Sequence, residues 1–92
     1  MSTKAQQALD PTSCWNKASD TEPVFVLRAN DEMAPGLVRL WAENYEQIKL
    51  AAQGLLSATQ LVKAHDARKI ARDMEMWRLA RDQAVRQASE KL

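Results

Sequence analysis

The chain has 92 residues, of which 46% are hydrophobic and 27% charged; this predicts one folded domain with a small core and excludes a disordered chain or a separate catalytic domain. Thirteen Lys and Arg residues against twelve Asp and Glu residues give a net charge of +1, so no overall field selects nucleic acid or an anionic membrane. No apolar run approaches the roughly 18 residues of a membrane-spanning helix, so we expect no segment that crosses a membrane.

The first residues of the chain are polar and have little to bury. We expect residues 1–9 to form a flexible tail and residues 10–92 to form a single α-helical domain. The tail lacks the apolar core of a signal peptide, and the single cysteine, Cys14, cannot form an internal disulfide. Both features predict a reducing, cytoplasmic location.

A short helix is predicted at residues 10–18. Asp10 is a preferred N-cap residue, and Pro11 suits the first helical position. Two turns are unstable alone, so Trp15 is expected to pack against the rest of the chain. Cys14 is either a small buried side chain or a reactive thiol at the start of the helix, and burial is the favoured interpretation.

The segment Val24–Arg28 is dominated by β-branched and aromatic residues, which favours an extended conformation. It is the only strand candidate in the sequence. Because a lone strand leaves its backbone groups unpaired, we expect it either to dock on the helices or to pair with its counterpart in a dimer.

Two longer helices are predicted after this segment. Pro35 fits only the first turn of a helix, Gly54 predicts that helix's end, and Ser57 or Thr59 can cap the next one. Residues 58–90 contain neither Gly nor Pro, so they are expected to be helical throughout. The predicted fold is mainly α: an antiparallel helical hairpin with a long C-terminal helix, a short N-terminal helix and one short extended segment. The apolar face of the first long helix is predicted to contain Leu37, Leu40, Trp41, Tyr45, Ile48, Ala52 and Leu55.

The two long helices differ in length. At 1.5 Å per residue the second would measure about 50 Å and the first about 30 Å. The second helix therefore either overhangs the first or kinks near Ala64-His65-Asp66. An overhang would expose an apolar stripe that requires a partner or a second copy. That stripe is predicted to contain Ala67, Ile70, Met74, Trp77, Arg81, Ala84 and Ala88.

A partner-binding surface is predicted on the overhang. Tryptophan and arginine are enriched where proteins bind one another. Trp77 is assigned equally to core and interface, whereas Trp41 lies in the middle of the first helix's apolar face and is expected in the core. The predicted partner-binding residues are Met74, Trp77, Arg78, Arg81 and Val85.

Residues 57–92 contain eight basic and five acidic side chains, which allows a second hypothesis of phosphate binding. Asp73 follows Lys69 by four residues and Asp82 follows Arg78 by four, a pattern typical of a solvated helix face, which is the favoured interpretation. The phosphate contacts of this alternative would be Arg68, Lys69, Arg72 and Arg86.

No catalytic arrangement is apparent. His65 has Asp66 beside it and Cys14 far away, which gives neither metal-ligand spacing nor a nucleophile–base pair. Gly36 and Gly54 are the only glycines, so a phosphate-binding loop is not expected. The sequence predicts a protein that is not an enzyme and uses no metal, cofactor or small-molecule substrate, with His65 structural or exposed to solvent.

Part of the chain is similar to small accessory proteins of bacteriophages and prophages. The similar residues fall within about residues 10–45 and are Cys14–Ala18, Glu22–Ala29, Asp31, Ala34-Pro35 and Val38–Ala42. The resemblance implies a protein that acts in the host cytoplasm by binding a host protein and inhibiting or redirecting it. Self-association as a homodimer is also expected. The alternatives are a nucleic-acid-associated regulator and a structural or assembly protein that acts only by self-association.

Overall fold

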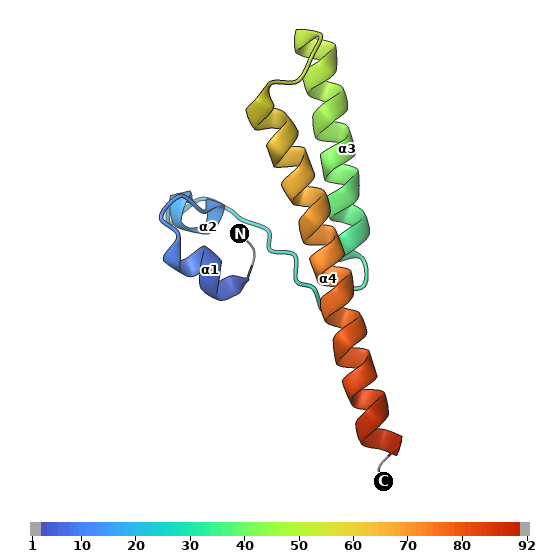
Figure 1. Cartoon of the computed structure of the whole chain (residues 1–92). Helices are drawn as coiled ribbons and strands as arrows, with labels where there is room; N and C mark the ends of the chain where they lie inside the picture. Colours follow the sequence, from blue (N-terminus) through green and yellow to red (C-terminus); the bar gives the residue numbers. More distant parts are fainter. Residues whose placement is uncertain (1–2, 91–92) are drawn as a thin grey trace.

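The structure, a computed structural model, describes residues 3–90. Four α-helices follow in chain order: α1 (Lys4–Leu9), α2 (Cys14–Lys17), α3 (Ala34–Gln53) and α4 (Ala58–Glu90). Helices α3 and α4 form an antiparallel hairpin, and α1 and α2 form a small separate unit beside it (Figure 1). The molecule is elongated, with principal extents of 58 × 31 × 21 Å. The predicted mainly α fold with a long C-terminal helix is therefore confirmed.

The N-terminal unit differs from the sequence prediction in its helix boundaries. Helix α1 lies where a flexible tail was expected. It begins with a capping box, in which the side chains of Thr3 and Gln6 each accept a hydrogen bond from the other's backbone N–H group. The predicted helix at 10–18 is shorter and begins at Cys14, because Ser13 is its N-cap. Asp10 instead ends α1 and accepts hydrogen bonds from the backbone and hydroxyl of Thr12, which makes a turn of residues 10–12.

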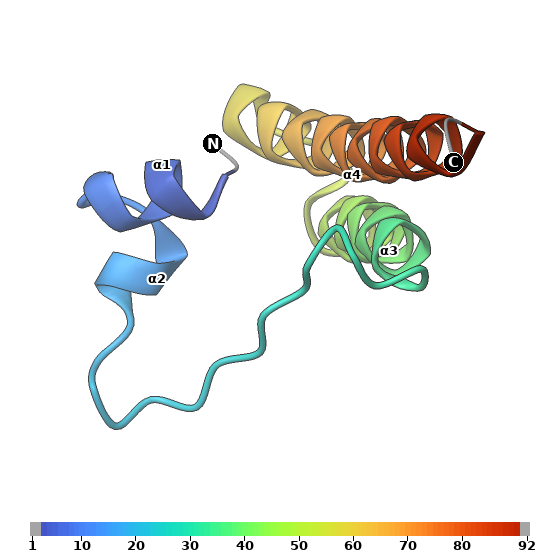
Figure 2. The ribbon, with the colours of Figure 1, turned by 90° about the horizontal axis from the view of Figure 1, so that it is seen from below.

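Polar contacts hold α1 and α2 together. The Ser13 hydroxyl donates to the Gln7 carbonyl at 2.8 Å, and the Asn16 amide donates to the same carbonyl at 2.9 Å and to that of Asp10 at 2.8 Å. The unit has no packing contact with α3 or α4 (Figure 2). The predictions that Trp15 packs and Cys14 is buried are wrong, because both side chains are exposed.

The connection between α2 and α3 runs as extended chain (Figure 2). Within residues 3–90 no strand forms, so the strand candidate Val24–Arg28 is extended without a partner. Val24, Phe25 and Val26 are exposed, and only Leu27 and Ala29 are half-buried. The expectation that Val24–Leu27 packs across the helices is therefore wrong for most of the segment.

The predicted boundaries of the hairpin helices are confirmed. Pro35 lies in the first turn of α3, and Gly54 ends the helix with a positive φ of 82°. The Gly54 N–H bonds the Leu50 carbonyl at 2.8 Å. Ser57 begins α4 through a reciprocal pair with Gln60, in which each accepts a hydrogen bond from the other's backbone N–H. Of the two predicted caps, Ser57 is the one used.

Helix α4 is continuous over its 33 residues, so the alternative of a break near Ala64-His65-Asp66 is not observed. Arg39 pairs with Glu75 and Glu46 with Arg68. Continuing this register places the first residue of α3, Ala34, opposite Ala80. Residues 81–90 therefore extend about 15 Å beyond α3, as the red end of the helix shows in Figure 1.

The contact between α3 and α4 is made by small side chains. Ala42 on α3 and Ala64 and Ala71 on α4 have no exposed surface, and the ion-pair register places Ala42 close to the level of Ala71. Alanine allows two helix axes to approach closely, which gives a narrow seam rather than a deep core. The α4 side of the seam repeats at intervals of three and four, through Gln60, Ala64, Ala67, Ala71, Met74, Arg78 and Arg81, and the half-buried Ile70 flanks it.

The predicted contact faces were therefore partly wrong. On α3, only Tyr45 of the predicted apolar face lies in the seam; Trp41, expected in the core, is 45% exposed. On α4, the predicted stripe shares Ala67, Met74 and Arg81 with the seam, whereas Trp77 lies to one side and is 52% exposed. Alanine side chains occupy the fully buried positions of the seam, whereas the predictions chose positions by hydrophobicity.

Candidate protein-binding surface

The hairpin's open end, where α3 begins and α4 continues, holds the five residues predicted to bind a partner. We call Met74, Trp77, Arg78, Arg81 and Val85 the open-end surface. All five lie on one half of α4, since at 100° per residue they fall within about 100° of one another. The structure thus places them as neighbours on one helix, partly beside α3 and partly beyond its end.

Trp77 and Arg81 form the centre of this surface. The Arg81 guanidinium lies 5.4 Å from the centroid of the Trp77 ring, which is a cation–π contact. The same guanidinium donates to the Asn30 side chain and, at 3.0 and 3.2 Å, to one oxygen of Asp82. Arg81 therefore holds Asn30, near the end of the connection between α2 and α3, against α4. It also covers one side of the Trp77 ring.

The other three residues differ in exposure. Met74 and Arg78 are half-buried in the seam, and Val85 on the overhang is 61% exposed. The Nε of Arg78 is shielded from solvent and has no hydrogen-bond partner in the described part of the chain. Such a group costs about 1–3 kcal/mol.

The four residues of the phosphate-binding alternative are partly engaged in ion pairs. Arg68 pairs with Glu46 of α3, and Lys69 lies 3.5 Å from Asp73. Arg72 and Arg86 are exposed on α4. A phosphate at Arg68 would have to displace the Glu46 carboxylate. For Arg68 and Lys69, a solvated helix face therefore describes the structure better than a phosphate-binding site.

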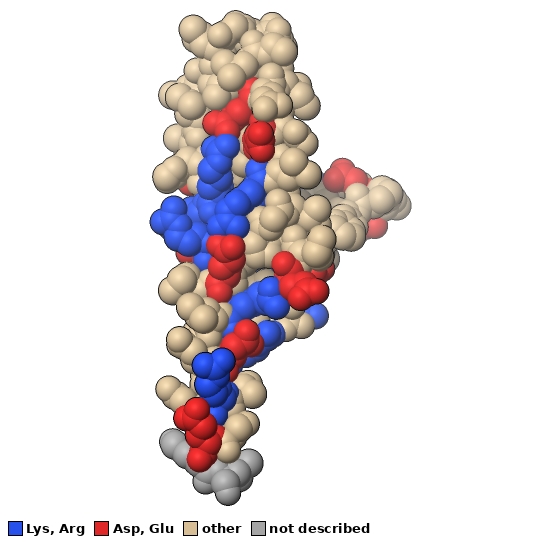
Figure 3. Space-filling view, turned by 90° about the vertical axis from the view of Figure 1, so that its right-hand side faces the viewer, with Lys and Arg blue, Asp and Glu red and all other residues tan. Residues whose placement is uncertain are grey.

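One long edge of the hairpin is charged. Arg39 donates to Glu75 from both guanidinium nitrogens, and Arg68 donates to Glu46. We call these four residues the charged edge. Figure 3 shows basic and acidic side chains alternating along one long face of the hairpin. The hydrogen bond from Arg68 lowers the pKa of Glu46, and that from Arg39 lowers the pKa of Glu75. Both pairs join α3 to α4, so they set the rotation of one helix against the other.

These pKa shifts predict how the hairpin responds to acid. A carboxyl group whose pKa is lowered by folding stabilises the fold above its ordinary pKa of about 4.3 and ceases to do so as the pH falls through the lowered value. We expect the melting temperature to fall as the pH drops from 6 to 3, and to fall less in a Glu46→Gln/Glu75→Gln variant. Because the pairs are exposed, 1 M NaCl should reduce the difference.

Circular dichroism at several pH values measures this effect. A Glu22→Gln/Glu32→Gln variant makes the same change of charge away from the ion pairs and should keep the pH dependence of the wild type. Equal pH dependence in all three proteins would contradict the role of the two carboxyl groups.

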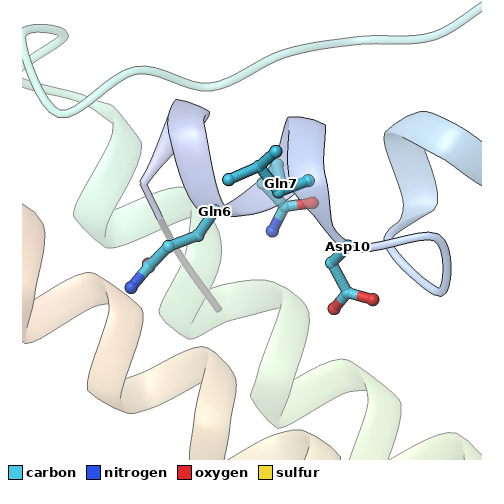
Figure 4. A pocket seen from close by; sticks show the side chains of 4 residues that line it. Gln6, Gln7 and Asp10 are labelled. Atoms are coloured by element: carbon cyan, nitrogen blue, oxygen red, sulfur yellow. The ribbon is translucent and has the colours of Figure 1, made fainter.

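The two residues considered for chemistry, His65 and Cys14, lie on separate parts of the molecule. Within residues 3–90 there is no cluster of His, Cys, Asp and Glu that could hold a metal ion. His65 is exposed on α4, and Cys14 is exposed on the separate N-terminal unit. A shallow depression on α1 is lined by Gln6, Gln7, Leu9 and Asp10, all from one short stretch of chain (Figure 4). It is open to solvent, whereas a ligand pocket encloses most of its ligand.

Among the described helices, none is long and apolar enough to cross a lipid bilayer. Comparisons with protein families, with curated proteins and with solved structures find no match to this chain. The function must therefore be argued from the surface of the hairpin itself.

Proposed function

We propose that this protein acts by binding another protein through the open-end surface and is not an enzyme. The observation that carries the proposal is the exposed Trp77 ring under the Arg81 guanidinium, one turn before α4 extends beyond α3. Tryptophan and arginine provide most of the energy at many protein interfaces. Beyond them, Val85 continues the same side of the helix with nothing from α3 to cover it.

The overhang explains why a helical protein would be a suitable partner. Residues 81–90 present one free side of a helix about 15 Å long, onto which a second helix or an extended segment can pack. The same seam that joins α3 to α4 runs on through Arg81 toward Val85. A partner would thus extend a packing pattern that the hairpin already contains.

We further propose that the partner is a host protein which this chain inhibits or redirects in the host cytoplasm. The support for this setting is the resemblance of residues 10–45 to bacteriophage and prophage accessory proteins. Nucleic-acid binding through Arg68, Lys69, Arg72 and Arg86 is the weaker alternative, because Arg68 and Lys69 already have carboxylate partners.

A capture experiment tests the open-end surface. The immobilised full chain is incubated with bacterial lysate, and the retained proteins are identified and quantified. A Trp77→Ala/Val85→Asp variant should retain at least about 10-fold less of a specific partner, because each change removes more than 1 kcal/mol at an interface centre. The helical content of the variant, measured by circular dichroism, should match the wild type, since both residues lie outside the alanine seam.

The matched control is Gln83→Ala, which changes the opposite side of the same overhang. It should retain the partner as the wild type does. Equal retention by the wild type and the Trp77→Ala/Val85→Asp variant would overturn the proposal. Retention that falls steeply with salt and disappears after nuclease treatment would favour the nucleic-acid alternative instead.

A further inference from the structure

The hairpin has a second long edge, opposite the charged edge, and it is apolar. Leu37, Trp41 and Ile48 lie on one side of α3, with the exposed Asn44 between the last two, and Ile70 lies on the matching side of α4. On each helix these residues are turned by more than 100° from the ion-paired residues. The exposed fractions of Leu37, Trp41 and Ile48 are 43%, 45% and 65%. We call Leu37, Trp41, Ile48 and Ile70 the apolar edge.

Aromatic and cationic contacts connect the two helices along this edge. The rings of Trp41 and Tyr45 are stacked with centroids 5.0 Å apart. Lys63 of α4 reaches across the seam, with its Nζ 5.8 Å from the Trp41 ring centroid and 5.4 Å from that of Tyr45. Lys49 of α3 also lies over the Tyr45 ring, with its Nζ 5.8 Å from the centroid, so two cations are held over rings of their own chain.

The seam beneath this edge supplies little hydrophobic stabilisation. The apolar residues with no exposed surface are Ala34, Ala42, Ala64 and Ala71, and no large side chain in residues 3–90 is fully buried. A buried methyl group contributes about 0.8 kcal/mol, whereas ordering one residue of backbone costs about 1–2 kcal/mol. A hairpin with so small a core needs additional apolar burial from outside.

The solvent-exposed area of the chain agrees with this need for further apolar burial. The chain exposes 7568 Å², whereas a compact monomer of 10.4 kDa would expose about 5400 Å² by size scaling. The overhang and the N-terminal unit contribute to the excess, and the apolar edge does as well. A face as long as α3 and two helices wide measures about 30 by 20 Å, which approaches the ~800 Å² that each partner buries in a standard interface.

We infer that a second copy of this chain packs on the apolar edge, forming a two-fold symmetric dimer in which two hairpins make a four-helix bundle. A net charge of +1 leaves only weak repulsion between copies. Two apolar edges match each other in length and chemistry, and pairing hairpins into a bundle is a common way to complete a small helical core. The chain's own N-terminal unit is the competing occupant, but its helices have six and four residues and are too short to cover the edge.

Sedimentation equilibrium of the full chain tests this dimer. The molecular mass of the wild type should be about twice 10.4 kDa at micromolar concentration. Ile48→Glu should weaken the dimer at least about 100-fold, because it places a charge in the apolar interface of both copies. Leu50→Glu is the matched control: Leu50 lies on α3 two residues away, is 44% exposed and faces the charged edge. It should leave the dimer intact.

A wild-type monomer at 100 µM would overturn the inference and would leave the edge to the N-terminal unit or to another protein. Equal dissociation of the two glutamate variants would overturn it as well. The outcome is separable from the proposed function through Val85, which lies on the overhang, whereas Trp77 lies two turns from Ile70 on the same side of α4. A Val85→Asp variant should lose the captured partner and remain a dimer. Ile48→Glu should keep both its helical content and the open-end surface.

Discussion

Replacing Ala71 by leucine should lower the free energy of unfolding by about 1–3 kcal/mol. Ala71 lies in the seam between α3 and α4 and has no exposed surface. The three added carbon atoms have no space there, so the helices must separate or the side chain must leave its preferred rotamer. Separation would also pull apart the Arg39–Glu75 ion pair, which lies one turn along the seam.

Chemical denaturation followed by circular dichroism measures this loss, at one fixed protein concentration because a dimer's stability depends on it. Ala80→Leu is the matched control, since Ala80 lies on the same helix and is exposed. It should change the free energy of unfolding by less than about 0.5 kcal/mol. If Ala71→Leu were as stable as Ala80→Leu, the helices would not be held together at the alanines.

The two glycines should respond in opposite directions to alanine. Gly54 has a positive φ of 82°, a conformation that costs an L-residue about 1–2 kcal/mol. Gly36 lies inside α3, where alanine is favoured over glycine by about 0.5–1 kcal/mol. A Cβ atom at either position would meet nothing within 4 Å. The difference between the variants therefore reports backbone conformation alone.

We expect Gly54→Ala to lower the melting temperature and Gly36→Ala to raise it. A synthetic chain with D-alanine at position 54 provides the decisive control, because a D-residue prefers positive φ and should be at least as stable as the wild type. If Gly54→Ala were as stable as Gly36→Ala, the α3–α4 turn would not require the left-handed conformation.

The boundaries of the two long helices could be predicted because they depend on local chemistry. Proline at the start of α3, glycine after its end, and a serine cap before a run without Gly or Pro act within a few residues of the chain. The same reasoning misplaced the N-terminal helix, since Asp10 and Ser13 are both good caps. The choice between them depends on Ser13 and Asn16 bonding back to α1.

The candidate binding residues could be predicted only in part. The overhang follows from two helix lengths, so Val85 was correctly expected beyond the end of α3. The arrangement of Trp77, Arg81 and Asn30 could not be predicted, because Asn30 is 51 residues from Arg81 and meets it only through the hairpin. Arg68 was considered for phosphate binding because residues 57–92 are basic; its ion pair with Glu46 could not be predicted, because Glu46 lies 22 residues away on the other helix.

By itself the sequence determined where the long helices begin and end, their difference in length, and the overhang that results. Only the tertiary structure decided which side of each helix faces the other. Both helices have more apolar residues than one seam can cover, so hydrophobicity alone cannot select the contact side. The close approach allowed by alanine and the two ion pairs along one edge make that selection, and they leave Trp41 and Ile48 exposed on the opposite edge.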